Sequence, residues 1–115
     1  MSFEEKYQRA IKELESTKIL RWNYNPPLIK LLHKLGAKVP PPHYNSFFGN
    51  TLLMGGHFGI AWGLFMYISI WRNQHMPAQT AILTAAGAGL FFGIFMAIYF
   101  KFSANKNRLN QWKDL

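Results

Sequence analysis

Two apolar stretches decide the fold: residues 51–71, TLLMGGHFGIAWGLFMYISIW, and residues 78–100, AQTAILTAAGAGLFFGIFMAIYF. A helix needs about 20 mainly apolar residues to cross the ~30 Å hydrocarbon core of a bilayer, and each stretch has that length. The segment between them is long enough only for a tight antiparallel return. The sequence therefore predicts an all-α membrane protein in which residues 47–100 form a two-helix transmembrane hairpin, with spans at about 51–71 and 78–100.

The charged residues lie outside the two spans. The net charge is +8, and lysines and arginines gather before residue 47 and after residue 100, whereas Arg72 alone lies between the spans. Lysine and arginine in short loops collect on the cytoplasmic side of a membrane. We therefore expect a multi-pass protein with both chain ends in the cytoplasm and with affinity for anionic lipid headgroups. Nucleic acid is not an expected partner, because the basic residues form no recognition module.

Residues 1–46 predict a cytoplasmic or interfacial region that contains two short helices. Ser2 and Glu5 have the spacing of a capping box, in which a serine caps a helix that carries glutamate three positions later. Apolar residues then recur at helical spacing, which predicts a first helix over about 3–16. The chain carries no apolar stretch at its beginning that would resemble a secretory signal.

The second short helix is expected over about 26–35. Asn25 suits its N-cap, Pro26 its first position and Gly36 its end. Its leucines share one face and its lysines the other, a pattern typical of a helix that lies in the membrane surface. A helix that binds a partner protein would show the same pattern. The candidate membrane-surface residues are Leu28, Lys30, Leu31, Leu32, Lys34 and Leu35.

Two further segments flank the spans. Residues 39–42, Val-Pro-Pro-Pro, cannot continue a helix and should form a stiff polyproline II linker. Residues 101–115 are polar and basic, and we expect them to form a cytoplasmic tail.

Small residues recur at every fourth position in both spans. Small side chains let two helices approach closely in lipid, where association depends on such packing. Because the turn is short, we expect the two faces to meet within one hairpin, although one of them could join another chain instead. The predicted helix-packing residues are Gly55, Gly59, Gly63, Ala81, Ala85, Gly89, Gly93 and Ala97.

His57 is a possible intramembrane polar site, because an ionisable residue inside a span is a functional hypothesis by default. At 100° per residue it lies opposite the glycine face of its own span. A neutral histidine bonded to backbone or water is the simplest interpretation. Axial ligation of haem is the alternative, since Gly55, Gly56 and Gly59 would admit a flat macrocycle beside it.

The remaining residues predict no enzyme, no metal site and no cofactor. The absence of cysteine removes disulfides, iron–sulfur ligation and thiolate nucleophiles. The other three histidines, His33, His43 and His75, lack the spacing of a metal site. Four of the five carboxylates lie in the first predicted helix, and so no acid–base pair is expected near an enclosed site.

The whole chain resembles a family of short, two-span bacterial inner-membrane proteins of unknown function. The likeness is carried by residues 23–28 (NYNPPL), 35–43 (LGAKVPPPH), 62–63 (WG) and 71–72 (WR). These are linker and packing motifs. The resemblance implies a location in the bacterial inner membrane and carries no catalytic residue.

Together these features favour a structural role. We expect a small accessory inner-membrane protein that associates with a larger membrane complex, or with itself as a homo-oligomer, through glycine-rich helix faces. The main alternative is a homo-oligomeric pore or membrane-permeabilising protein, which would need a polar stripe along a helix. A second alternative is a redox subunit with a haem ligated by His57.

Overall fold

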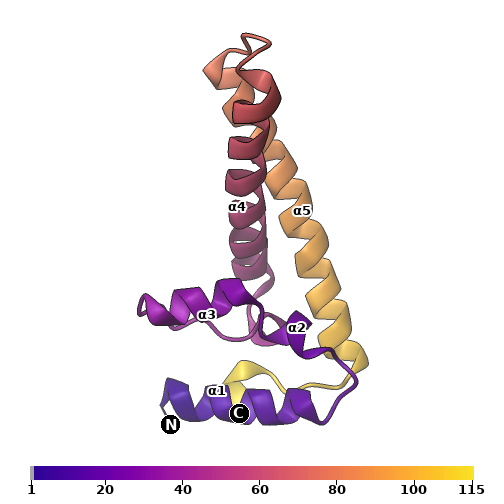
Figure 1. Cartoon of the computed structure of the whole chain (residues 1–115). Helices are drawn as coiled ribbons and strands as arrows, with labels where there is room; N and C mark the ends of the chain where they lie inside the picture. Colours follow the sequence, from indigo (N-terminus) through magenta and orange to yellow (C-terminus); the bar gives the residue numbers. More distant parts are fainter. Residues whose placement is uncertain (1) are drawn as a thin grey trace. The chain divides into compact units, whose positions relative to one another are not determined.

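The computed structural model describes residues 2–115, which are helical or irregular and include no β-strand. The five α-helices are α1 (Phe3–Glu15), α2 (Arg21–Tyr24), α3 (Pro27–Lys34), α4 (Phe47–Met66) and α5 (Ala78–Lys106) (Figure 1). The chain forms two compact units. The terminal unit contains residues 2–45 together with residues 100–115, and the helix-pair unit contains residues 46–99.

Two helices are long and apolar enough to cross a membrane, namely Phe47–Trp71 and Ala78–Lys106. The first comprises α4 and a π-helical turn, η2 (Tyr67–Trp71). Ser46 caps its start by accepting a hydrogen bond from the backbone amide of Gly49 at 3.0 Å. The all-helical class predicted from the sequence is confirmed, and both helices extend beyond the predicted spans.

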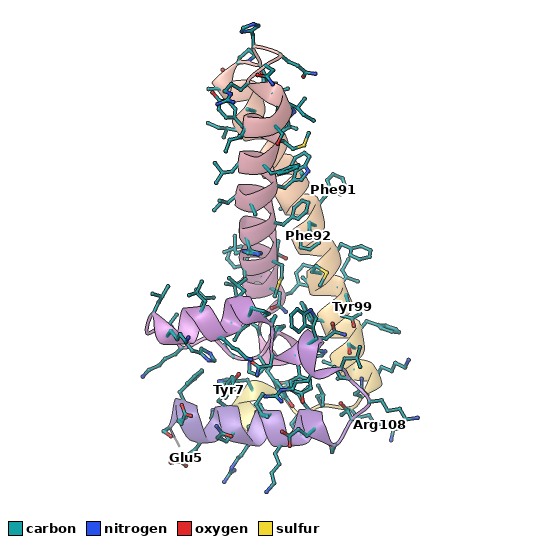
Figure 2. The ribbon with its side chains drawn as sticks, viewed as in Figure 1. Glu5, Tyr7, Phe91, Phe92, Tyr99 and Arg108 are labelled. Atoms are coloured by element: carbon teal, nitrogen blue, oxygen red, sulfur yellow. The ribbon has the colours of Figure 1, made fainter. Side chains whose placement is uncertain are left out.

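In the terminal unit, α1 begins with the predicted serine cap. The Ser2 side chain accepts a hydrogen bond from the Glu5 amide at 3.2 Å. Tyr7 points toward the interior of the unit and Glu5 away from it (Figure 2). The Tyr7 ring lies edge-on to the His33 ring of α3, with centroids 4.9 Å apart, so that α1 and α3 pack through aromatic side chains.

The core of the terminal unit joins both ends of the chain. Ala10, Leu14, Tyr24 and Tyr44 are buried together, and residues near the C-terminus pack against them: Leu109, Trp112 and Leu115. The sequence predicts a polar, basic tail over residues 101–115. In the structure α5 runs on to Lys106, and the segment after it folds onto α1, because its three large apolar side chains lose water contact there.

Helix α3 begins one residue later than predicted. Pro26 is its N-cap and Pro27 its first residue, whereas Asn25 ends α2, a one-turn helix that the periodicity did not reveal. The Asn25 side chain accepts a hydrogen bond from the Tyr7 hydroxyl at 3.3 Å, so it fastens α1 rather than capping α3.

Gly36 ends α3 as predicted. Its φ of +91° lies in the left-handed region that glycine adopts without steric cost. The amide of Ala37 then bonds to the carbonyl of Leu32, and the amide of Gly36 to that of His33. This pair of bonds is the Schellman motif.

The proline-rich segment is part of the core and not an exposed spacer. Pro41 keeps the extended conformation expected of polyproline, with φ −55° and ψ 150°, but a one-turn helix, η1 (Pro42–Tyr44), follows at once. Pro41 and Pro42 are among the most completely buried side chains of the described residues. The stiffness of this segment therefore serves to hold Tyr44 in the core.

Candidate helix-packing site

In the helix-pair unit, α4 and α5 run antiparallel and touch backbone to backbone. A methyl group added to Gly55 would lie 2.5 Å from the Gly89 carbonyl oxygen, and one added to Gly89 would lie 2.6 Å from the Gly55 carbonyl oxygen. A methyl group on Gly93 would collide with the Thr51 carbonyl oxygen. No other residue type leaves room for this approach, and so glycine is required at these three positions.

The remaining predicted small residues continue the same seam. A methyl group on Gly59 would lie 3.1 Å from the Ala85 carbonyl oxygen, and one on Gly63 would lie 2.7 Å from the Ala85 methyl carbon. Ala81 and Ala97 are buried as well. The structure thus brings six of the eight predicted residues together where α4 meets α5: Gly55, Gly59, Gly63, Ala85, Gly89 and Gly93.

An aromatic cluster fills one side of this pair. Phe58 stacks on Phe92 with ring centroids 4.4 Å apart and on Trp62 at 6.0 Å, and Trp62 meets the edge of Trp71 at 5.5 Å. Phe92 points toward α4, whereas its neighbour Phe91 points outward and is 83% exposed (Figure 2). The cluster was not predicted, because its members come from two helices and a turn.

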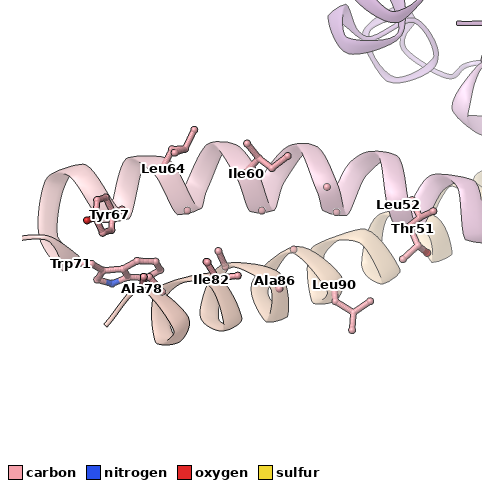
Figure 3. A pocket seen from close by; sticks show the side chains of 17 residues that line it. Thr51, Leu52, Ile60, Leu64, Tyr67, Trp71, Ala78, Ile82, Ala86 and Leu90 are labelled. Atoms are coloured by element: carbon pink, nitrogen blue, oxygen red, sulfur yellow. The ribbon is translucent and has the colours of Figure 1, made fainter. Parts of the chain in front are cut away.

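A groove runs along the seam between the two helices (Figure 3). Its volume is about 620 Å³, and glycine and alanine residues of both helices line it. Tyr67 and Trp71 lie at the end of the groove near the turn. Five large aliphatic side chains line it as well: Leu52, Ile60, Leu64, Ile82 and Leu90. Small residues therefore have two effects here: they bring the helices together, and they leave a groove beside the contact.

The π-helical turn η2 lies at one end of this groove, which its first and last residues, Tyr67 and Trp71, line. The Arg72 amide bonds to the Tyr67 carbonyl five residues earlier, at 2.9 Å. Such a turn inserts one extra residue into a helix and rotates the side chains that follow it. Trp71, the last residue of this turn, lines the groove, contacts Trp62 and is buried. Nothing in the apolar sequence of this stretch distinguishes a π-turn from a regular α-helix.

His57 lies on the surface of α4 and is exposed within the helix pair. It does not line the groove, and it lies away from the glycine seam, as the helical periodicity predicted. Within residues 2–115, no three histidine or carboxylate side chains lie close enough together to hold a metal ion. The environment of His57 therefore depends on what surrounds α4.

The leucine face of α3 is divided. Leu31 and Leu35 are exposed, and Leu28 and Leu32 are half-buried. Lys30 and Lys34 are exposed on the other side. A third face of α3 packs against the rest of the terminal unit. It is formed by the fully buried Ile29 and by His33, whose ring nitrogen is 2.7 Å from the Val39 carbonyl oxygen.

His43 forms a second feature that the sequence did not reveal. It is only 6% exposed, its ring meets the edge of Phe100, and its Nε2 lies 3.2 Å from the Ser103 hydroxyl. Its Nδ1 is buried without a hydrogen-bond partner among residues 2–115. Burial lowers the pKa of His43 from 6.5 to about 4, because the charged ring would lose its hydration. A neutral His43 thus fastens the end of α5 within the terminal unit.

Comparison with known proteins places the chain in a family without defining its role. No curated protein matches it. No solved structure matches it either. The full length of the chain, residues 1–115, matches a family of unknown function (DUF6404), and the protein belongs to that family.

Proposed function

We propose that this protein is a small, non-enzymatic accessory protein of the bacterial inner membrane. In this proposal α4 and α5 cross the bilayer as a hairpin, with both chain ends in the cytoplasm. The proposal is supported by large apolar side chains that stay exposed around the helix pair, among them Ile60, Phe65, Phe91 and Phe95. Lipid tails or apolar helices are the surroundings in which such side chains lose their contact with water.

The observation that carries the proposal is the groove along the seam. The glycine faces hold the pair together, and so an external helix must dock on what remains exposed. The groove is lined by glycine and alanine together with large aliphatic side chains, and close packing on small residues drives helix association in lipid. We assign it to a transmembrane helix of a larger membrane complex, or to a second copy of this chain.

The pore alternative receives less support from the polar groups of the two helices. A pore needs a polar stripe exposed along one face. The Thr51 hydroxyl donates to the Phe47 carbonyl at 2.9 Å, and the Thr84 hydroxyl to the Thr80 carbonyl at 2.8 Å. Both hydroxyls thus donate within their own helices, which leaves only their acceptor lone pairs for a water column.

A matched pair of glycines tests the proposal. Gly56 lines the groove and Gly87 does not, and a methyl group at either position would meet no atom within 4 Å. Gly56→Leu should fill the groove without disturbing the helix pair, whereas Gly87→Leu serves as the control. After gentle detergent extraction, Gly56→Leu should lose the co-purifying complex or the homo-oligomer while the chain still accumulates in the membrane. Retention of every partner by both variants would contradict the proposed use of the groove.

A further inference from the structure

The terminal unit buries part of its apolar surface and exposes another part on α2 and α3 and the residues that flank them. Ala10, Leu14, Tyr24 and Ile29 form its interior. Besides Phe102 on α5, which is 66% exposed, four large apolar side chains remain open, with these exposed fractions: Leu20 69%, Trp22 72%, Leu31 54% and Leu35 75%. These four are the ones considered next. They lie in one continuous stretch of the chain, between the end of α1 and the proline-rich segment.

The same stretch is strongly basic. Residues 16–38 contain no aspartate or glutamate, and five cations alternate with the exposed apolar residues: Lys18, Arg21, Lys30, Lys34 and Lys38. All five are exposed. The glutamates of the unit lie on α1 instead. An acid-free, basic surface with protruding leucine and tryptophan is complementary to a bilayer surface with anionic headgroups, and a protein partner of mixed charge would not require it.

The short connection between α3 and α4 also favours the bilayer as the partner. Residues 39–46 join this stretch to α4, and an extended chain of that length reaches at most on the order of 30 Å. If α4 crosses the bilayer, α3 is held close to the headgroups, and the effective lipid concentration that it meets is high. This step rests on the proposed membrane role.

We infer that α2 and α3 together form a membrane-surface platform that binds the anionic headgroup region of the cytoplasmic leaflet. Leu20, Leu31 and Leu35 enter the boundary between headgroups and acyl chains. Trp22 lies at headgroup depth, where its apolar ring and polar N–H both find suitable surroundings. The lysines stay in water beside the lipid phosphates. Helix α2 gives this platform a second contact, which the leucine pattern of α3 alone did not predict.

The absence of cysteine allows a direct test on the full chain. Single-cysteine variants carry an environment-sensitive fluorophore at position 20 or 35, in nanodiscs of phosphatidylcholine with or without phosphatidylglycerol. In anionic discs, acrylamide should quench both labels several-fold less than in neutral discs. The double substitution Lys30→Gln and Lys34→Gln should lower the ratio of docked to undocked platform about 25-fold, because each cation near an anionic surface strengthens binding about fivefold.

Two control positions separate the possible failures. Gln8 is exposed on α1, so a label at Gln8→Cys should be quenched equally in both kinds of disc. Phe91 is 83% exposed on α5 and does not line the groove, and its label should be shielded in both if the helix pair spans the bilayer. An accessible label at position 91 would overturn the membrane role itself. Shielding at position 91 with free access at position 20 or 35 would overturn the platform and assign the open residues to a protein partner.

Discussion

Asn110 donates two hydrogen bonds to Glu13 across a separation of 97 positions in the chain. Its backbone amide reaches one carboxylate oxygen at 2.9 Å, and its side-chain amide reaches the other at 2.7 Å. The Tyr44 hydroxyl donates to the first of these oxygens at 2.6 Å. One carboxylate thus connects α1, η1 and the segment after α5, and it fixes the C-terminal residues on the core of the terminal unit.

The first prediction concerns this carboxylate. Glu13→Ala should lower the free energy of unfolding by about 2 kcal/mol, because the buried Tyr44 hydroxyl loses its charged acceptor. Asn110→Ala, at an exposed position, should cost only about 1 kcal/mol. Hydrogen exchange of residues 109–115 provides the measurement, with Glu15→Ala as an exposed control. Unchanged protection in Glu13→Ala would show that the apolar contacts alone hold this segment.

The second prediction concerns the glycine seam. Gly55→Ala, Gly89→Ala and Gly93→Ala each place a methyl group against the opposite backbone, and each should destabilise the helix pair by about 1–3 kcal/mol. Gly56→Ala and Gly87→Ala meet no atom within 4 Å and should be neutral or stabilising by up to about 1 kcal/mol, since alanine favours helix. Thermal unfolding in detergent compares the two sets. Equal tolerance of both would mean that the seam does not hold the helices together.

The third prediction is a pH dependence set by His43. An unfolded histidine titrates near 6.5, whereas the pKa of folded His43 is about 4. Between these two pH values, His43 binds a proton in the unfolded chain but stays neutral in the folded chain. The contribution of neutral His43 to the free energy of unfolding is therefore fully present above pH 6.5 and falls by about 3 kcal/mol as the pH drops to 4.

Denaturant titrations at several pH values measure the slope of the free energy of unfolding against pH. His43→Leu should flatten it between pH 6.5 and 4. The control is His75→Asn, because His75 is exposed and has a φ of +56°, which asparagine tolerates. If His43→Leu retains the slope of the parent protein, another group must be responsible for it.

The fourth prediction concerns His57 and the haem alternative. His57 is exposed on α4, so His57→Leu should leave folding and accumulation in the membrane unchanged. An absorption spectrum of the purified parent protein is expected to lack a Soret band. A Soret band that disappears in His57→Leu would instead support the redox subunit.

The fifth prediction concerns topology. Because the basic residues flank the outer ends of both spans, reporters fused to either terminus should report the cytoplasm. A label at Gln74, in the exposed turn, should be reachable only from the opposite side of the membrane. A periplasmic N-terminus would overturn both the proposed orientation and the platform on the cytoplasmic leaflet.

The sequence determined those features that depend on local composition and spacing. The length and hydropathy of the two stretches predicted the long helices, Ser2 predicted the start of α1, and Gly36 predicted the end of α3. These features depend on residues within one or two turns of each other. The four-residue spacing of glycine and alanine likewise marked a packing face, because a helix places every fourth residue on one side.

Only the tertiary structure decided how distant segments use these faces. It closed the glycine seam within one chain, left the groove beside it, and buried Trp71 at the end of a π-turn that the apolar sequence does not distinguish from an α-helix. It also brought Asn110 to Glu13 and buried His43. These contacts join segments that are remote in the chain, and their energies depend on shape and burial, which no local pattern of residues records.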